Sequence, residues 1–343
     1  MLAYTAVSKL LLYPTLLSAE CGRDLLFPAL FDFILQTFIV WAVCFLSSKT
    51  DKTFFELIKG TLGQVVARVV YGLFGAFFLI ATLIPLLEQK LYVHAIFYDT
   101  IPSLMVFLPV FFFLVYAGSK GLKNIGRCAD ICMPIFVLSA LFILVTAFIE
   151  VKWDNFLPVF KTPVKTVFGA SLSTLYRFME PCWLLMFLGH FKYRKNDTLK
   201  ITLSYAGGAI IVLMFLFAFY GVYGEMAQSR QFAVSKISIF FPAMEMLGRI
   251  DLVVLYVLET VMLFALVLNI QLAAYCFEKS TGFKNRKALS AVINGILLIL
   301  VIALDNKFNA VSVLYAKWMW IAFILFANVL PLAVWLLKRR AKK

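Results

Sequence analysis

Long apolar runs dominate the chain and restrict it to a fold embedded in a membrane. Runs such as GLFGAFFLIATLIPLL (72–87) and ILLILVIAL (296–304) carry no charge, and a helix of about 20 apolar residues crosses roughly 30 Å of hydrocarbon. They also lack the polar–apolar alternation of a membrane β-strand. Charged residues make up 15% of the 343 residues, whereas a soluble domain has about a quarter. We therefore predict an all-α integral membrane protein.

The apolar runs predict ten transmembrane helices in a single membrane domain covering residues 1–343. The predicted spans are residues 2–19, 25–47, 63–87, 102–118, 130–149, 165–190, 201–224, 250–277, 288–304 and 312–337. Lys and Arg concentrate in the loops after the second, fourth, sixth and eighth spans and in the tail KRRAKK. The positive-inside rule then places both termini in the cytoplasm. The net charge of +14 follows this topology, so we expect no nucleic-acid partner.

Three connections between spans are expected to be structured. TDKTFFELIKG, after the second span, predicts a short amphipathic helix on the membrane surface. The longer loops EVKWDNFLPVFKTPVK (150–165) and GEMAQSRQFAVSKISIFFPAMEMLGR (224–249) can cap an outer vestibule or receive a partner. Met1 opens directly into the first span without a basic leader, so we expect no cleaved signal peptide.

The composition also argues against a metal site, a cofactor and an enzyme. The six cysteines form no CxxC pair and the chain has two histidines, so we expect free thiols that pack like small hydrophobic residues. No nucleophile–base pair or phosphate-binding loop is recognisable in the sequence.

Four charged residues stand out within the predicted spans: Lys9, Arg177, Glu180 and Glu259. An ionised side chain at the bilayer centre costs from about 3 to more than 10 kcal/mol, so each needs a partner or water. Arg177 and Glu180 share one helix face, and a local ion pair is the simplest explanation for them. Glu259 has an equally simple explanation as a hydrogen-bonded packing residue.

Pro181 indicates more than a local ion pair. It removes a backbone hydrogen bond and clashes with the carbonyl of Arg177, so the helix should break near residues 177–181. Unpaired backbone groups at that depth are tolerated only where they are buried in protein or line a cavity. The segment YRFMEP (176–181) therefore predicts a ligand site.

The first span carries a related arrangement, KLLLYP, with Lys9 five residues before Pro14. Spans 1 and 6 are the first members of two sets of five, and an odd number of spans per set inverts the second set. We therefore predict a five-plus-five inverted repeat with discontinuous spans 1 and 6, in which Lys9 and Glu180 pair across a central site. A chance coincidence of proline positions is the alternative.

Several segments resemble one known family. They are KLLLYPTLLSAECGRDLLFPALF (9–31), YAGSKGLKNIGRCADICMPIFVL (116–138) and NFLPVF (155–160), followed by the span that carries Glu180. They look like the B subunit of spore germinant receptors, the endospore germination permeases of the amino acid-polyamine-organocation superfamily. The resemblance implies a multi-pass protein of the spore inner membrane. It also implies an A subunit and a lipoprotein C subunit as partners and an amino acid as the usual ligand.

The resemblance and the charge pattern together give a set of candidate residues. Ligand contacts are expected from Glu180, Arg177, Tyr176, Lys9, Ser8, Ala6, Tyr71 and Glu259, between spans 1, 3, 6 and 8, with Thr5 as a further hydroxyl. Arg127 matches a basic position of the family, and with Asp130, Pro14 and Pro181 it is expected to act in gating or assembly. The residues before Lys9 lack the glycine that relatives often have at the break.

Two other functions are compatible with the same sequence. A proton-coupled amino acid transporter acting alone would share the fold, so the fold cannot exclude it. An ion-conducting channel would use the buried polar residues to handle ions in place of an organic ligand.

Overall fold

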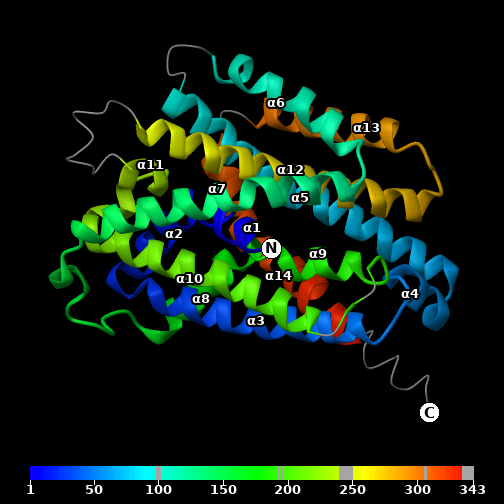
Figure 1. Cartoon of the computed structure of the whole chain (residues 1–343), viewed down its shortest axis with the longest axis horizontal. Coiled ribbons are helices and arrows are strands. Elements are labelled where there is room, and N and C mark those ends of the chain that lie inside the picture. The colour runs from blue at the N-terminus through cyan, green and yellow to red at the C-terminus, as the bar shows by residue number, and fades with distance from the viewer. Residues whose placement is uncertain (98–101, 192, 195, 239–249, 305–306, 334–343) are drawn as a thin grey trace. The chain divides into compact units, whose positions relative to one another are not determined.

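The computed structural model describes residues 1–97, 102–191, 193–194, 196–238, 250–304 and 307–333. All regular structure in these ranges is helical (Figure 1). The α-helices are α1 Leu2–Val7, α2 Tyr13–Cys21, α3 Leu26–Ser48, α4 Phe54–Leu62, α5 Gln64–Phe97, α6 Ser103–Gly118, α7 Leu122–Ile149, α8 Val164–Thr174, α9 Glu180–Phe187, α10 Asp197–Tyr223, α11 Ala233–Ser238, α12 Ile250–Thr281, α13 Arg286–Ala303 and α14 Phe308–Phe323, which continues as a π-helix over Ile324–Val329. Part of the predicted loop 224–249, the end of the tenth predicted span and the basic tail lie outside the described residues.

Seven helices in the described ranges are long and apolar enough to cross a membrane. They cover Leu26–Ser48, Gln64–Ala95, Asn124–Ile149, Asp197–Ser229, Leu255–Thr281, Arg286–Ala303 and Ala310–Ala333. The other three predicted spans fall on α1 with α2, on the shorter apolar helix α6, and on α8 with α9. The sequence thus predicts the seven uninterrupted spans, and the remaining three are short or broken.

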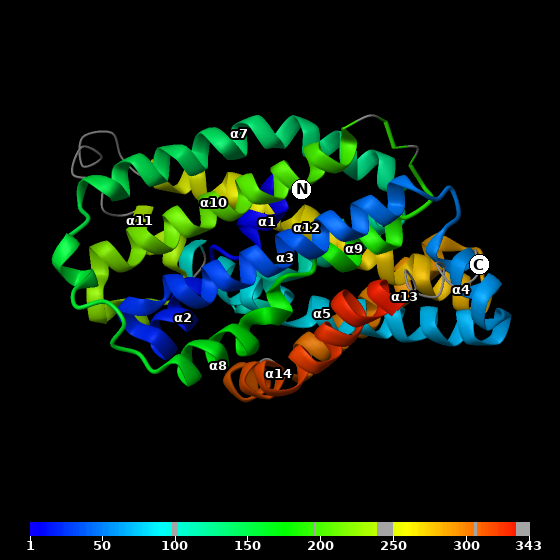
Figure 2. The same cartoon turned by 90° about the horizontal axis from the view of Figure 1, so that it is seen from below.

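The helices divide into two compact units, each assembled from separate stretches of chain. The first unit comprises Met1–Thr37, Gly126–Arg177 and Leu203–Phe264. Within it α2 packs against α8, as Figure 2 shows, and against the 3-10 helix Gly224–Ser229. Gly208 lets α10 approach α1 closely, because a Cβ there would lie 2.8 Å from the carbonyl oxygen of Leu2. Small residues at this position of α10 thus serve close helix packing.

The second unit comprises Phe38–Ile125, Phe178–Thr202 and Ala265–Lys343. Here α4 packs on α5, and α6 lies along α13 (Figure 1). Aromatic rings fill much of its interior: the ring centroids of Phe74 and Phe326 are 4.7 Å apart, and those of Phe55 and Tyr71 are 5.0 Å apart. Helix α14 is fixed to α5 by a hydrogen bond of 2.8 Å from the Tyr315 hydroxyl to the carbonyl of Ile80.

Helix α4 confirms the amphipathic helix predicted after the second span. Its apolar side chains Phe54, Leu57 and Ile58 are buried at helical spacing. The helix begins with a capping box, in which Thr53 Oγ1 accepts from the Glu56 amide at 3.3 Å and Glu56 Oε2 accepts from the Thr53 amide at 2.8 Å. These hydrogen bonds hold the pKa of the exposed Glu56 carboxyl below its usual range.

Candidate functional site

The first predicted span is interrupted where the sequence predicts it. Helix α1 ends at Val7, residues 8–12 form turns and bends, and α2 begins at Tyr13. Pro14 occupies the first turn of α2, where its missing N–H would have no helical acceptor. The carbonyl of Leu11 accepts a hydrogen bond of 3.0 Å from the Ala233 amide. The interruption is therefore buried in protein and has backbone partners of its own.

Lys9 lies at this interruption and is fully buried. Its Nζ donates to the Thr5 carbonyl at 3.4 Å and to Ser8 Oγ at 3.3 Å, and it lies 5.9 Å from the centroid of the Phe33 ring. The carbonyl of Thr5 is near the carboxyl end of α1, where the partial negative charge of a helix end favours a cation. The end of α1 thus supplies an acceptor for the ammonium group.

Asp32, on α3, supplies an acidic group beside Lys9. It is fully buried, interacts electrostatically with Lys9, and accepts a short hydrogen bond from Ser171 Oγ on α8. Gln36, one helical turn later, is also fully buried. A buried charge is retained when it has both an opposite charge and hydrogen bonds. Asp32 therefore links the interruption of the first span to α3 and α8.

Tyr13 extends these contacts toward the second interruption. It is fully buried and interacts electrostatically with Asp32 and Arg177 and with the side chain of Thr174. The guanidinium carbon of Arg177 lies 5.2 Å from the centroid of the Tyr176 ring. We call Lys9, Tyr13, Asp32, Ser171, Thr174 and Arg177 the Lys9 cluster. All six residues are buried and all belong to the first unit.

The sixth predicted span is also interrupted at the predicted place. Helix α8 ends at Thr174, the 3-10 turn Leu175–Arg177 follows, and α9 begins at Glu180. Pro181 occupies the first turn of α9, as Pro14 does in α2. Glu180 is fully buried at the first position of α9, and the amino end of a helix favours an acidic group. Glu180 belongs to the second unit.

The other predicted residues have different environments. Ser8 contacts Lys9, and Ala6 is fully buried and accepts from the Lys9 amide at 3.0 Å. Tyr71 is fully buried in the aromatic interior of the second unit. Glu259 is partly exposed on α12, whereas the Lys9 cluster is buried.

Arg127 and Asp130, predicted at the entry to the fifth span, lie within α7 and are exposed. Asp130 lines a small cavity of about 60 Å³ together with Met1 and Tyr4. Arg127 and Asp130 are thus exposed, whereas the residues of the Lys9 cluster are buried.

The sequence-based selection of charged residues within the spans was incomplete, because it omitted Asp32. A signal was present: in LLFPALFDFILQTF (25–38), Asp32 and Gln36 are four residues apart and share one face of an otherwise apolar helix. Such a polar face must turn toward protein or water when the helix lies in lipid. This spacing could have identified Asp32 before its contacts were known.

The loop 150–165 is structured, and it lines one side of a larger cavity in the first unit. The Asp24 carboxylate accepts hydrogen bonds from the amides of Phe160 at 2.9 Å and Thr162 at 2.7 Å. Arg23 donates to the carbonyl of Leu157 and pairs with Glu225 at 3.2 Å. The cavity, of about 430 Å³, is lined by residues 18–23, by residues 161–163 of this loop, and by parts of α10 and the following turn. A cavity thus lies beside the loop 150–165 in the first unit.

Apolar helices with two interruptions and buried charges, as found in the described residues, are features of a transporter-like membrane protein. The crystal structure of MhsT in complex with L-phenylalanine matches with a TM-score of 0.63 and 13% identity, over 97% of this chain and 88% of the MhsT chain, so the two proteins share a fold. The model of the spore germination protein family matches residues 28–309, and the chain belongs to that family. No curated protein matches the sequence.

Proposed function

We propose that the protein is the membrane subunit of a spore germinant receptor and that it binds a small zwitterion, such as an amino acid, at the helix interruptions. The buried Lys9 and Asp32 at the first interruption carry this proposal. Buried ionisable residues in a membrane protein are expensive and usually mark a functional site. Membership of the spore germination protein family supports the receptor role.

The charges of the Lys9 cluster match the two charges of an amino acid. In the proposed bound state the carboxylate of the ligand contacts the Lys9 ammonium and backbone groups of the first interruption. The ligand ammonium contacts the Asp32 carboxylate, and binding is proposed to depend also on Glu180 at the second interruption. When the ligand binds, its charged groups replace contacts that Lys9 and Asp32 make within the protein. This replacement shifts the interrupted helices and starts the germination response.

The same proposal includes topology and partners. The chain crosses the spore inner membrane ten times, with both termini in the cytoplasm and a five-plus-five inverted repeat. The A subunit and the lipoprotein C subunit are the partners. On the outer loop, the side chains of Trp153, Leu157 and Phe160 are 70%, 61% and 78% exposed, and this apolar surface suits contact with a partner subunit.

A proton-coupled transporter acting alone is the second candidate, and the similarity to the fold of MhsT favours it. The two functions differ in whether the bound amino acid crosses the membrane. Equilibrium binding of labelled amino acids by the purified chain, combined with uptake into proteoliposomes with and without an inward proton gradient, separates them.

For the receptor we expect saturable binding without accumulation, and loss of binding in Asp32→Asn and Glu180→Gln. The matched control is Glu225→Gln, which removes a carboxylate whose side chain is 81% exposed. Accumulation driven by the gradient and lost in Glu180→Gln would identify a transporter. Sustained conductance without any ligand would identify a channel.

A further inference from the structure

The second unit contains a basic cavity that the proposed function does not use. The cavity has a volume of about 120 Å³ and is lined by Gly118 and Lys120 at the end of α6, His190 after α9, Gln271 and Tyr275 on α12, and Arg286 at the start of α13. These residues lie near the ends of the fourth, sixth and eighth predicted spans or in the loops that follow those spans. All three loops are predicted to be cytoplasmic. The cavity therefore lies where three basic loops meet.

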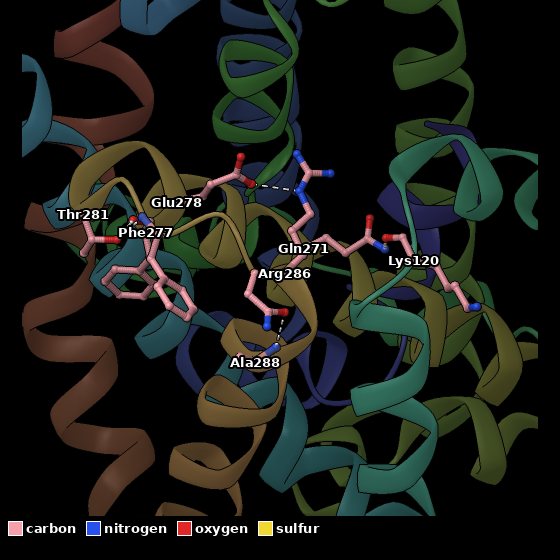
Figure 3. A network of polar contacts seen from close by, with 9 residues as sticks. Lys120, Gln271, Phe277, Glu278, Thr281, Arg286 and Ala288 are labelled. Carbon is pink, nitrogen blue, oxygen red and sulfur yellow. Dashed lines mark hydrogen bonds and ion pairs between the residues drawn. The ribbon is translucent and has the colours of Figure 1, made fainter.

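The cationic groups around the cavity are suited to an anion with several oxygens. Arg286 donates from Nε to the Glu278 carboxylate at 2.8 Å, which leaves its two terminal amino groups for another acceptor (Figure 3). Lys120 and Arg286 are exposed, and His190 offers a ring N–H. The guanidinium fork matches the geometry of a phosphate, and lysine adds a point charge. Glu278, 20% exposed and paired to Arg286, is an acidic competitor at the rim.

The wall of the cavity is held by hydrogen bonds and close packing. Gln271 donates from Nε2 to the carbonyls of Ala117, at 2.8 Å, and of Lys120, which fixes the end of α6 (Figure 3). A Cβ on Gly118 would lie 2.6 Å from Ser290 Oγ, so α6 and α13 are in direct contact there. The buried Gln271 Oε1 has no hydrogen-bond partner among the described residues. The backbone at Lys120 is thus held in place, and its Nζ lies 4.6 Å from the centroid of the Tyr116 ring.

We propose that this cavity binds a phosphate group, and that the phosphate belongs to the headgroup of an anionic lipid. Basic pockets between helices on the cytoplasmic side of a membrane protein are suited to such headgroups. Exposed aromatic residues flank the lining residues along the chain: Tyr116, Phe191 and Phe283 are 64%, 61% and 50% exposed. Aromatic residues at span ends sit at the level of the headgroups. The headgroup phosphate occupies the cavity while the acyl chains remain outside it.

The test is a titration of the full-length chain in zwitterionic detergent with short-chain phosphatidylglycerol, and in parallel with inorganic phosphate, following the unfolding temperature. The double variant Lys120→Gln/Arg286→Gln removes both lining cations, and the control Lys284→Gln/Lys287→Gln removes two exposed cations of the same loop that do not line the cavity. At about 1 kcal/mol per basic residue, we expect the lining variant to bind phosphatidylglycerol roughly 30-fold more weakly. The control keeps wild-type binding.

A third variant, Glu278→Gln, removes the acidic competitor and should strengthen binding. A response to phosphatidylglycerol but not to inorganic phosphate identifies the lipid as the source of the phosphate. A response to both that the lining variant loses supports a phosphate site that soluble ligands also enter. Equal losses in the lining variant and the control would show nonspecific attraction and overturn the site. Amino acid binding is measured on the same samples, so failure of this site is distinct from failure of the proposed function.

Discussion

The two helix interruptions share a proline at the point where the helix restarts, but Lys9 at the first and Glu180 at the second have opposite charges. In each, a helix restarts with a proline in its first turn and without a side-chain N-cap, at Pro14 in α2 and at Pro181 in α9. Lys9 follows the carboxyl end of α1 and donates to one of its last carbonyls, whereas Glu180 opens the amino end of α9. Each charge thus lies at the helix end whose partial charge complements it.

This difference shows how a membrane protein retains buried ionisable groups without burying a bare charge. Lys9 and Glu180 each occupy a helix end that compensates part of the desolvation cost, and Asp32 adds a side-chain partner for Lys9. Helix α4 provides a reference, because it starts with a full capping box and its Glu56 is exposed. The three helix ends can be compared by substitution, from the buried pair at the end of α1 to the exposed cap of α4.

The largest effect is expected for the buried pair of Lys9 and Asp32. Lys9→Met and Asp32→Asn each remove one of two buried ionisable groups that interact electrostatically, and removing one partner of a buried pair costs about 3–5 kcal/mol. The double variant Lys9→Met/Asp32→Asn removes both charges and should be more stable than either single variant. Thermal unfolding of the four proteins in detergent measures the coupling between the two residues.

The matched control for this cycle is the exposed pair of Lys200 and Asp197. Their charged atoms are 3.8 Å apart, and the Lys200 side chain is 74% exposed, so we expect a coupling below about 1 kcal/mol. Equal coupling in the two cycles would mean that burial contributes nothing to the interaction of Lys9 with Asp32.

A steric substitution tests whether the position of α1 matters for the first interruption. In Gly208→Ala the new Cβ would lie 2.8 Å from the Leu2 carbonyl oxygen and 2.9 Å from Thr5 Cβ, so α1 must move. Overpacking of this kind costs about 1–3 kcal/mol, and the displacement of Thr5 should also weaken amino acid binding. Both are measured on the same preparation, by thermal unfolding and equilibrium binding.

Gly207→Ala is the neighbouring control. Its Cβ would lie 3.2 Å from the end of the flexible Leu2 side chain, which can move aside, and alanine is the better helix former by roughly 0.5–1 kcal/mol. We expect unchanged or slightly higher stability and normal binding. If Gly208→Ala also binds the amino acid normally, then the position of α1 does not determine ligand recognition.

At the second interruption, Glu180→Gln keeps the side-chain volume and removes the carboxylate. A favourable interaction with a helix end contributes at most about 2 kcal/mol, so the loss of stability should be smaller than for Lys9→Met. Ligand binding should nevertheless be lost, because the proposed role of Glu180 is in the site. A variant that is destabilised as much as Lys9→Met and still binds ligand would make Glu180 a purely structural residue.

The helix interruptions could be predicted because a proline and charged residues occur together within one apolar span, as they do at Pro14 and Pro181. Proline alone does not interrupt a span, since Pro85 and Pro134 lie inside the continuous helices α5 and α7. The seven uninterrupted spans follow from length and hydropathy. The electrostatic interaction of Lys9 with Asp32 and the hydrogen bond from Ser171 to Asp32 join residues of different helices. Such pairings depend on which helix faces meet, which neither hydropathy nor proline spacing specifies. The grouping of the helices into two units depends on the same information.

The smallest effect is expected at the exposed start of α4. The two hydrogen bonds of its capping box contribute differently to stability as the pH changes. Thr53→Ala removes the hydroxyl acceptor and should cost about 1 kcal/mol at any pH, because a hydroxyl does not titrate in this range. Glu56→Ala removes the carboxylate that accepts from the Thr53 amide. Because the folded state lowers the pKa of Glu56, this contribution is present above the unfolded-state pKa of about 4.3 and disappears as the pH falls through the folded-state value.

Unfolding temperatures of both variants at neutral and acidic pH measure this difference. The deficit of Glu56→Ala should shrink toward zero in acid while that of Thr53→Ala persists. A deficit of Glu56→Ala that is independent of pH would show that the side chain stabilises α4 by packing and not as an ionised cap. The exposed carboxylate of α4 would then be no reference for the carboxyl group of Glu180, and the comparison of buried and exposed helix starts would rest on the Lys9 and Asp32 cycle alone.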